Sequence, residues 1–404
     1  MDANSGAGAS GSIATPAGSG GFLATVLSGP TVPALAARVG AWFAALWGKP
    51  IRFCGMVVVA RHSQVMEVLH RDLEFRIAPI NETRIVEVNG PFVLGMDRGV
   101  TLVQERDALY QALSVVDLAP IRLAIEQEAA QRVAAAGNEI DVVGGYARPI
   151  AAHTAKALFG IGGSDEQTFM DVARAVFGHV FLNQAGDTAI RNRALAAAVL
   201  MKDWFETEIA RRRASGELGV DMMGALLRGG MLDDEGVRRT LGGMLVGSID
   251  TTASCVAKIV TMIVKHPGLA KSFAADVDDD VRLAGWCREA LRLWPHNPAV
   301  LRQAVADARL GELDIREGDQ IIAWTQAAML DTAAFPDPQQ LRPDRPAAAY
   351  LHFGGGLHPC AGRAVNAFQI PALVAALVRR GIKSIGPMQW AGPFPDHLPL
   401  YLGR

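Results

Sequence analysis

The sequence predicts a mainly α-helical protein with small β-sheets, an α+β architecture built as one domain. Apolar residues recur at helical spacing over most of the stretch 104–345. A β-branched run at 51–60 and a hairpin pattern at 309–324, with Gly311 and Gly318 as turn markers, predict the sheets. No linker divides residues 21–404, and 50% hydrophobic side chains in 404 residues are enough for a large core.

The helical body is predicted element by element from this spacing. A short helix, "SQVMEVLHR", follows the first strand, and 73–103 is predicted to be irregular because it contains Pro79, Asn89 and Pro91. A last helix at about 361–380 follows a segment, 332–362, that is rich in Pro, Gly and Asp. The remaining predicted helices are 104–116, 119–136, 147–159, 164–182, 187–214, 234–264, 267–274 and 277–293.

The N-terminal segment is predicted to lie outside the folded domain. Residues 1–20 lack the basic and apolar regions of a secretory signal and are typical of a flexible Gly/Ser/Ala tail. The apolar run from Gly21 to Trp47 contains Pro30, Pro33 and Arg38, so it favours a helix packed on the body over a membrane span.

Charge and cysteine usage narrow the class of protein. A formal net charge of −2 gives no reason to expect nucleic acid or an anionic membrane as partner. The four cysteines, Cys54, Cys255, Cys287 and Cys360, are widely spaced, which argues against a disulfide scaffold and suits a reducing cytoplasm.

The stretch "HFGGGLHPCAGR", His352 to Arg363, surrounds one cysteine with glycines, histidines and an arginine. A helical run follows Cys360, so its sulfur lies at a helix N-terminus, where the dipole favours a thiolate. A cysteine protease would need a histidine and asparagine partner, and a zinc site would need further ligands at short spacing. An axial thiolate on haem iron needs one cysteine, a glycine-lined approach and cations for the propionates.

The stretch "FGGGLHPCAG" resembles the haem-binding loop of the cytochrome P450 superfamily, Phe-x-x-Gly-x-His-x-Cys-x-Gly. All five fixed positions match: Phe353, Gly356, His358, Cys360 and Gly362. The resemblance, to the soluble bacterial type, implies haem b (iron protoporphyrin IX) between the long central helix and the Cys-loop helix. It also implies Cys360 as the iron ligand, and Phe353, Gly354, His358 and Gly362 around the cofactor.

Three further stretches resemble the family in the expected order. "EALR" supplies Glu289 and Arg292 as the Glu-x-x-Arg pair, with Arg345 of "FPDPQQLRPDRP" as a third partner. "RQAVAD" supplies Arg302, whose counterpart in the family contacts a haem propionate.

The apolar stretch 241–260 meets polar residues at Asp250 and Thr251. Gly247 to Thr251 resembles the family's Ala/Gly-Gly-x-Asp/Glu-Thr sequence, in which a helix break admits O2 while the acid and the alcohol supply protons. Ser248 departs from the usual glycine, and its hydroxyl either supports a water chain or crowds the oxygen groove.

A second departure lies in "ERDALY", where Arg106 and Tyr110 stand at the positions of the family's His-x-x-x-Arg propionate pair. They are either propionate partners or ordinary residues of a solvated helix face. Walls of the substrate pocket are placed by analogy alone: Phe92, Val93, Leu94, Met244, Gly247, Ala299, Val300 and Phe394.

The resemblance implies a cytoplasmic haem-thiolate monooxygenase that inserts one oxygen atom of O2 into an apolar small molecule by hydroxylation or epoxidation. Electrons are expected from NAD(P)H through a ferredoxin- or flavodoxin-type donor and its reductase. Two alternatives stay open: peroxide-driven or isomerase-type chemistry on the same fold, and a non-enzymatic haem sensor or carrier.

Overall fold

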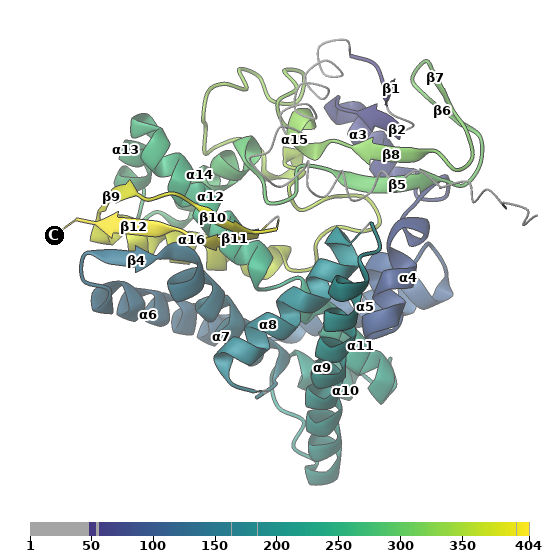
Figure 1. The fold of residues 1–404 in the computed structure, drawn as a ribbon, viewed down its shortest axis with the longest axis horizontal. Coiled ribbons are helices and arrows are strands. Elements are labelled where there is room, and N and C mark those ends of the chain that lie inside the picture. The colour runs from purple at the N-terminus through teal and green to yellow at the C-terminus, as the bar shows by residue number, and fades with distance from the viewer. Residues whose placement is uncertain (1–47, 54–55, 163, 184, 393, 404) are drawn as a thin grey trace, which may run out of the picture.

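The computed structural model describes residues 48–53, 56–162, 164–183, 185–392 and 394–403. The predicted tail at 1–20 and the predicted helix within 21–47 lie outside these residues. The described chain folds as a helical body with a small β-rich part at one end (Figure 1).

Helices form most of the body, as the sequence predicts. Their bounds are α3 His62–His70, α4 Ala78–Asn89, α5 Val100–Val115, α6 Ala119–Ala135, α7 Arg148–Phe159, α8 Glu166–Phe177, α9 Thr188–Ser215, α10 Met222–Gly229, α11 Asp234–Val246, α12 Asp250–Lys265, α13 Pro267–Ala275, α14 Asp280–Leu293, α15 Thr325–Ala328 and α16 Arg363–Arg380. Two π-helices, η2 Val142–Ala147 and η3 Gly178–Leu182, and two 3-10 turns, η1 Val93–Gly95 and η4 Ala347–Ala349, complete the set.

The largest sheet joins strands from 51–76 with strands from 300–323, in the order β1-β2-β8-β5-β3. Its strands are β1 Ile51–Phe53, β2 Met56–Val59, β8 Gln320–Ala323, β5 Val300–Ala304 and β3 Phe75–Arg76. The β-branched run of β2 pairs in parallel with β8, Val57 opposite Ile321, and β8 pairs antiparallel with β5, Ile322 opposite Leu301. This pairing holds the chain just before β5 beside the end of α14.

The other strands of the described residues form three smaller sheets. A three-stranded sheet has the order β4-β12-β9, with β4 Glu139–Asp141, β12 Pro399–Leu402 and β9 Ile382–Ile385. The hairpins are β6 Ala308–Leu310 with β7 Leu313–Ile315, and β10 Gln389–Ala391 with β11 Phe394–His397. The β10–β11 hairpin lies near α12 in the middle of the molecule (Figure 1).

The prediction for the segment before residue 104 is wrong. Residues 73–103 were expected to be irregular, yet α4 occupies Ala78–Asn89. Pro79 falls in the first turn of the helix, where its missing N–H costs nothing, and Gly90 ends the helix at a φ of 77°. The residues read as breakers therefore mark the two ends of one helix.

The segment Asp234–Lys265 is long and apolar enough to cross a membrane, but 83% of its apolar window is buried inside the fold. It comprises α11 and α12, and α12 is buried along nearly its whole length. These helices are therefore the core of the described body (Figure 1).

Candidate haem-thiolate site

The cysteine loop is held by tight backbone geometry. The N–H of Cys360 donates to the carbonyl of Phe353 at 2.8 Å, which closes the loop on itself. Gly356 has a φ of 65°, and a Cβ added there would lie 1.8 Å from the carbonyl oxygen of Leu69 on α3. Only glycine fits this approach, so the glycine run in the sequence has a steric cause.

Cys360 precedes α16, which begins at Arg363. Burial raises the pKa of its thiol, while the N–H groups of Gly362 and Arg363 and the Arg363 charge act in the opposite direction. Cys360 nevertheless keeps accessible surface, which fits a sulfur surrounded by protein but open on one side. A bound metal cation would deprotonate such a thiol, because coordination stabilises the thiolate directly.

Cations gather beside this loop. Arg302 on β5 is buried, and its one hydrogen bond goes to the carbonyl of Leu301 at 2.7 Å. No carboxylate within the described residues forms an ion pair with it, and burial lowers its pKa to about 10. The pKa of His358 falls to about 4 through burial, then through the charge of Arg302, with a smaller contribution from Arg106.

Two cationic groups held close together each disfavour the other's positive charge. An anion between them removes this repulsion, so such a pair forms an anion site. Arg302 and His358, with Arg106 nearby, therefore suit the propionates of a haem. The Arg106 guanidinium stacks over the ring of Tyr110, 5.4 Å from its centroid, so these two predicted residues lie together on one face of α5.

The central helix is interrupted between α11 and α12, at Gly247–Ile249. The hydroxyl of Thr251 donates to the carbonyl of Gly247 at 2.6 Å, and that of Ser248 to Leu245 at 2.8 Å. Such bonds from side chain to backbone open a helix. The Ser248 hydroxyl is engaged by its own helix, and its two expected roles, support of a water chain or crowding of the oxygen groove, stay predictions.

The break faces the cysteine loop. Thr252 lies 3.2 Å from Oδ1 of Asn366, a residue in the second turn of α16. Gly247 keeps accessible backbone in an otherwise apolar helix, and Thr251 remains partly accessible. Thr251 and Cys360 thus lie on elements that meet, each with accessible surface.

Asp250 lies behind the break and is held by two arginines that the sequence reasoning missed. Oδ1 accepts from Arg174 on α8 at 2.6 and 2.9 Å, and Arg148 on α7 lies 3.0 Å away. Arg174 also pairs with Asp396 on β11 at 2.5 Å. Within the described chain Oδ2 of Asp250 receives no side-chain hydrogen bond, so one carboxylate oxygen stays available for a proton.

Beneath the loop, Glu289 and Arg292 are both fully buried. Arg292 donates to both carboxylate oxygens at 2.8 and 2.9 Å, and Arg345 lies 3.4 Å from Oε2. The Tyr350 hydroxyl donates to Oε1 at 2.7 Å, and the Arg342 N–H to Oε2 at 3.0 Å. Despite the burial, these donors hold the pKa of Glu289 below its usual value.

Of the residues predicted to line the substrate pocket, some are buried in packing contacts and others keep accessible surface. Phe92 is buried against α11, where a Cβ on Gly243 would come within 2.5 Å of its ring, so it anchors its segment. Phe394 belongs to an aromatic cluster with Phe177 and His296, which the sequence reasoning missed. Val93 and Ala299 are buried, whereas Leu94, Met244, Gly247 and Val300 keep accessible surface.

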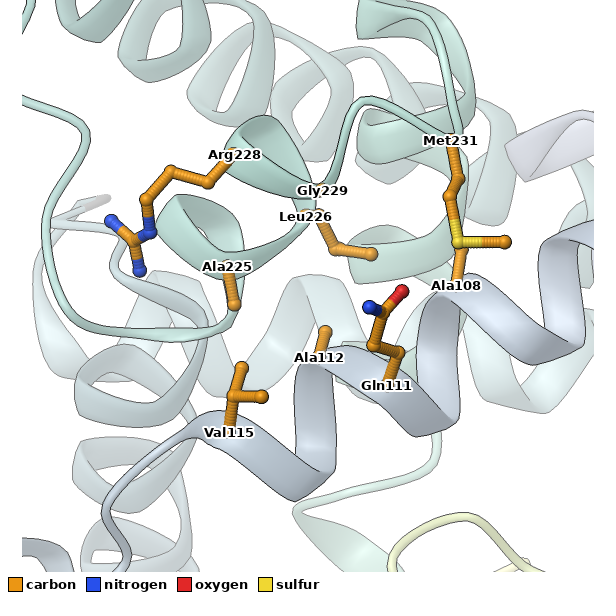
Figure 2. A pocket seen from close by; sticks show the side chains of 9 residues that line it. All are labelled: Ala108, Gln111, Ala112, Val115, Ala225, Leu226, Arg228, Gly229 and Met231. Carbon is orange, nitrogen blue, oxygen red and sulfur yellow. The ribbon is translucent and has the colours of Figure 1, made fainter.

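A separate cavity of about 440 Å³ lies between α5 and α10 (Figure 2). Ala108, Ala112 and Val115 line it from α5. At 100° per residue these positions lie on the face of α5 opposite to Arg106 and Tyr110. The cavity contains none of the predicted site residues and is not part of the cysteine site.

Comparison with known proteins identifies the class. The mainly helical fold is shared with solved cytochrome P450 structures. CalO2 superposes with a TM-score of 0.81 at 23% identity over 92% of this chain and 98% of that chain. The open cytochrome P450 EryK from S. erythraea has a TM-score of 0.78 at 22% identity, over 92% and 97%.

The sequence model described as Cytochrome P450 matches residues 187–380. Nocardicin C N-oxygenase from Nocardia uniformis subsp. tsuyamanensis is 28% identical over 62% of this chain and 61% of its own. Mycinamicin IV hydroxylase/epoxidase from Micromonospora griseorubida is 26% identical over 67% of both. The first two curated relatives are matched over 61% and 56% of their length.

The family model, the curated relatives and the solved structures together support a cytochrome P450 of the bacterial type. The family implies a haem cofactor. The accessible Cys360 and the buried, unpaired Arg302 are residues that such a cofactor would engage, so the donor set fits it.

Proposed function

We propose that this protein is a haem-thiolate monooxygenase that inserts one oxygen atom from O2 into an apolar small molecule. The proposed cofactor is haem b, with Cys360 as its axial ligand and Arg302, His358 and Arg106 as propionate partners. The observation that carries the proposal is the accessible Cys360 sulfur opposite a helix break that presents Thr251.

When bound, the haem would activate oxygen. The residues of this chain would deliver protons and position the substrate. Thr251 presents a hydroxyl at the break, and its bond to Gly247 fixes where that hydroxyl points. Asp250 delivers protons from the side of α7 and α8 through Oδ2, while Arg148 and Arg174 hold Oδ1. A positioned acid of this kind accelerates a proton-dependent step by roughly 10²–10⁴.

Electrons are proposed to come from NAD(P)H through a ferredoxin- or flavodoxin-type donor in the cytoplasm. Arg363 is exposed at the start of α16, three residues from Cys360, and forms no ion pair with any residue that the structure describes. Arg288 on α14 lies near the same loop, through its effect on His352, but its guanidinium lies over the Tyr350 ring and its Nε is sealed from solvent. The exposed cation of Arg363, close to the thiolate, therefore suits an acidic donor protein.

A surrogate electron donor tests this arrangement. Arg363→Glu should raise the KM for an acidic ferredoxin by about tenfold, because it places a carboxylate where the donor needs a cation. Reduction by dithionite, which requires no docking, should be unchanged. Arg379→Glu, an exposed site near the far end of α16, is the control and should alter neither rate. Equal KM values for the two variants would contradict this docking site.

The relatives support the reaction class through their printed names, a 20-oxo-5-O-mycaminosyltylactone 23-monooxygenase and a cyclooctat-9-en-7-ol 5-monooxygenase among them. Incubation with ¹⁸O₂, NAD(P)H and surrogate redox proteins should place one labelled oxygen atom in a product. Label arriving from H2¹⁸O2 alone, with NAD(P)H unused, would indicate the peroxide-driven alternative. A haem sensor would consume neither reductant nor O2.

A further inference from the structure

His296 is a partly buried residue that has no role in the proposed haem site. It lies between α14 and β5, in the stretch "WPHNP". Lys258 on α12 donates to the carbonyl of Pro295 at 2.8 Å and lies 3.3 Å from that of His296. The backbone is therefore fixed to the same helix that carries Thr251, two turns further along.

The ring of His296 is part of an aromatic cluster. It stacks on Phe394 with centroids 6.0 Å apart and an interplanar angle of 15°. Phe177 meets both rings edge-on, at 6.3 Å from His296 and 5.1 Å from Phe394, and Phe181 lies 4.7 Å from Phe177. Phe394 of β11 and Phe177 at the end of α8 therefore both contact the imidazole, and Phe181 of η3 contacts Phe177.

Neither ring nitrogen of His296 has a hydrogen-bond partner among the described residues. Nδ1 is sealed from solvent and has no hydrogen-bond partner among the described residues. Nε2 is not one of the sealed atoms, and no described residue bonds to it. Burial, and then the charge of Lys258, hold the pKa of His296 down to about 3. The imidazole is therefore neutral, with one N–H to donate and one lone pair to accept.

An aromatic wall with one unsatisfied, uncharged polar group suits a particular ligand chemistry. Apolar pockets gain specificity from a few polar groups placed among hydrophobic side chains. A neutral imidazole recognises a carbonyl or hydroxyl oxygen through its N–H, and it offers no charge to a carboxylate. A buried polar group left without a partner also penalises a ligand that lacks the matching atom.

We propose that His296 is a specificity-determining residue that binds a carbonyl or hydroxyl oxygen of an otherwise apolar, ring-containing substrate. The inference rests on the proposed function, since it takes the space between Cys360, Thr251 and the aromatic cluster as the substrate site. The stack on Phe394 and the anchored backbone fix the imidazole, and His296 thereby sets which carbon of the substrate approaches the haem.

Matched probes test the assignment without turnover. α-Tetralone and tetralin have nearly the same shape, but only the ketone can accept a hydrogen bond. Dissociation constants for the ferric holoprotein are measured from the haem absorbance change and, independently, from tryptophan fluorescence. The parent should bind the ketone about tenfold more tightly than the hydrocarbon, as expected for one buried hydrogen bond.

Three variants separate recognition from packing. His296→Phe should bind tetralin as the parent does and lose the preference for the ketone. His296→Gln, which keeps a donor, should retain part of that preference. Phe177→Leu should weaken both probes to the same extent, because it reduces the aromatic wall alone. Circular dichroism and haem content identify any variant that fails to fold, in which case His296→Gln carries the comparison.

The outcomes decide the proposal. A ketone preference in the parent that disappears in His296→Phe supports it. A parent that binds both probes equally, or neither, overturns it, as does a preference that survives in His296→Phe. The proposed function fails by a different measurement, the spectrum of the reduced CO complex. A protein with the thiolate spectrum and no ketone preference keeps the proposed function and loses this inference.

Discussion

Removal of Arg292 should destabilise the protein far more than the loss of an ordinary ion pair. The guanidinium is fully buried and donates to both oxygens of Glu289, at 2.8 and 2.9 Å. It also reaches the carbonyls of Met329 at 3.2 Å and Gln340 at 3.4 Å. Arg292→Ala leaves a buried carboxylate whose remaining side-chain donors are Arg345 and Tyr350.

The expected cost follows from that geometry. Breaking one partner of a buried ion pair costs about 3–5 kcal/mol, because an uncompensated charge remains. Native proteins are stable by about 5–15 kcal/mol, so this loss takes about a fifth of the total or more. Because Glu289 and Arg345 lie under the cysteine loop, haem retention should decline together with stability.

Guanidinium titration followed by far-UV circular dichroism and by haem absorbance measures both effects. Arg379→Ala is the matched control, since its pair with Asp278 is exposed, with 55% and 83% of the two side chains accessible. Such a pair contributes about 0–1 kcal/mol. Glu289→Gln combined with Arg292→Ala should recover part of the loss by removing the stranded charge. If Arg292→Ala shifts the midpoint no more than Arg379→Ala, the reasoning is wrong.

Three further predictions follow from the site. Thr251→Ala should oxidise NAD(P)H at a comparable rate but release more H2O2, with the ratio of product to NAD(P)H falling roughly tenfold; an unchanged ratio would remove this hydroxyl from the mechanism. Arg302→Leu should transfer haem to apomyoglobin about tenfold faster or more, since a charge-assisted bond to a propionate is lost, whereas an equal transfer rate would contradict its role. His296 has a folded-state pKa of about 3, below the unfolded value of about 6.5, so its contribution to stability is fully present above pH 6.5 and declines as the pH falls toward 3. Stability of the parent should consequently decline more steeply between pH 6.5 and 4.5 than that of His296→Phe, and parallel pH profiles would show that the imidazole is not held neutral.

The features of the site that could be predicted from the sequence depend on residues that lie close together along the chain. The cysteine loop is one continuous segment, and its Gly356 is required by a backbone approach that no side chain permits. Glu289 and Arg292 lie one turn apart on α14, so their bidentate pairing follows from helix geometry. The mainly helical fold was predicted correctly for the same reason, because its periodicity is local.

Contacts between distant segments could not be read from the sequence. Arg148 and Arg174 reach Asp250 only because α7 packs against α12 and α8 packs against α11, and nothing in their own surroundings marks them. Phe177, Phe394 and His296 come from three elements that are far apart in the chain. For α4, Pro79 was read as a breaker because its position within the first turn depends on where the helix starts.

The reduced CO complex of Cys360→Ser tests the central claim most directly. The sulfur of Cys360 is accessible at the N-terminus of α16, while Cys255 and Cys287 are buried, and burial raises the pKa of Cys255 to about 12 and also raises that of Cys287. The parent should show the red-shifted Soret band of thiolate ligation, and Cys360→Ser should lose it while keeping some haem. Cys255→Ser, the control, should retain the band. Identical spectra for the parent and Cys360→Ser would show that this cysteine does not bind the iron.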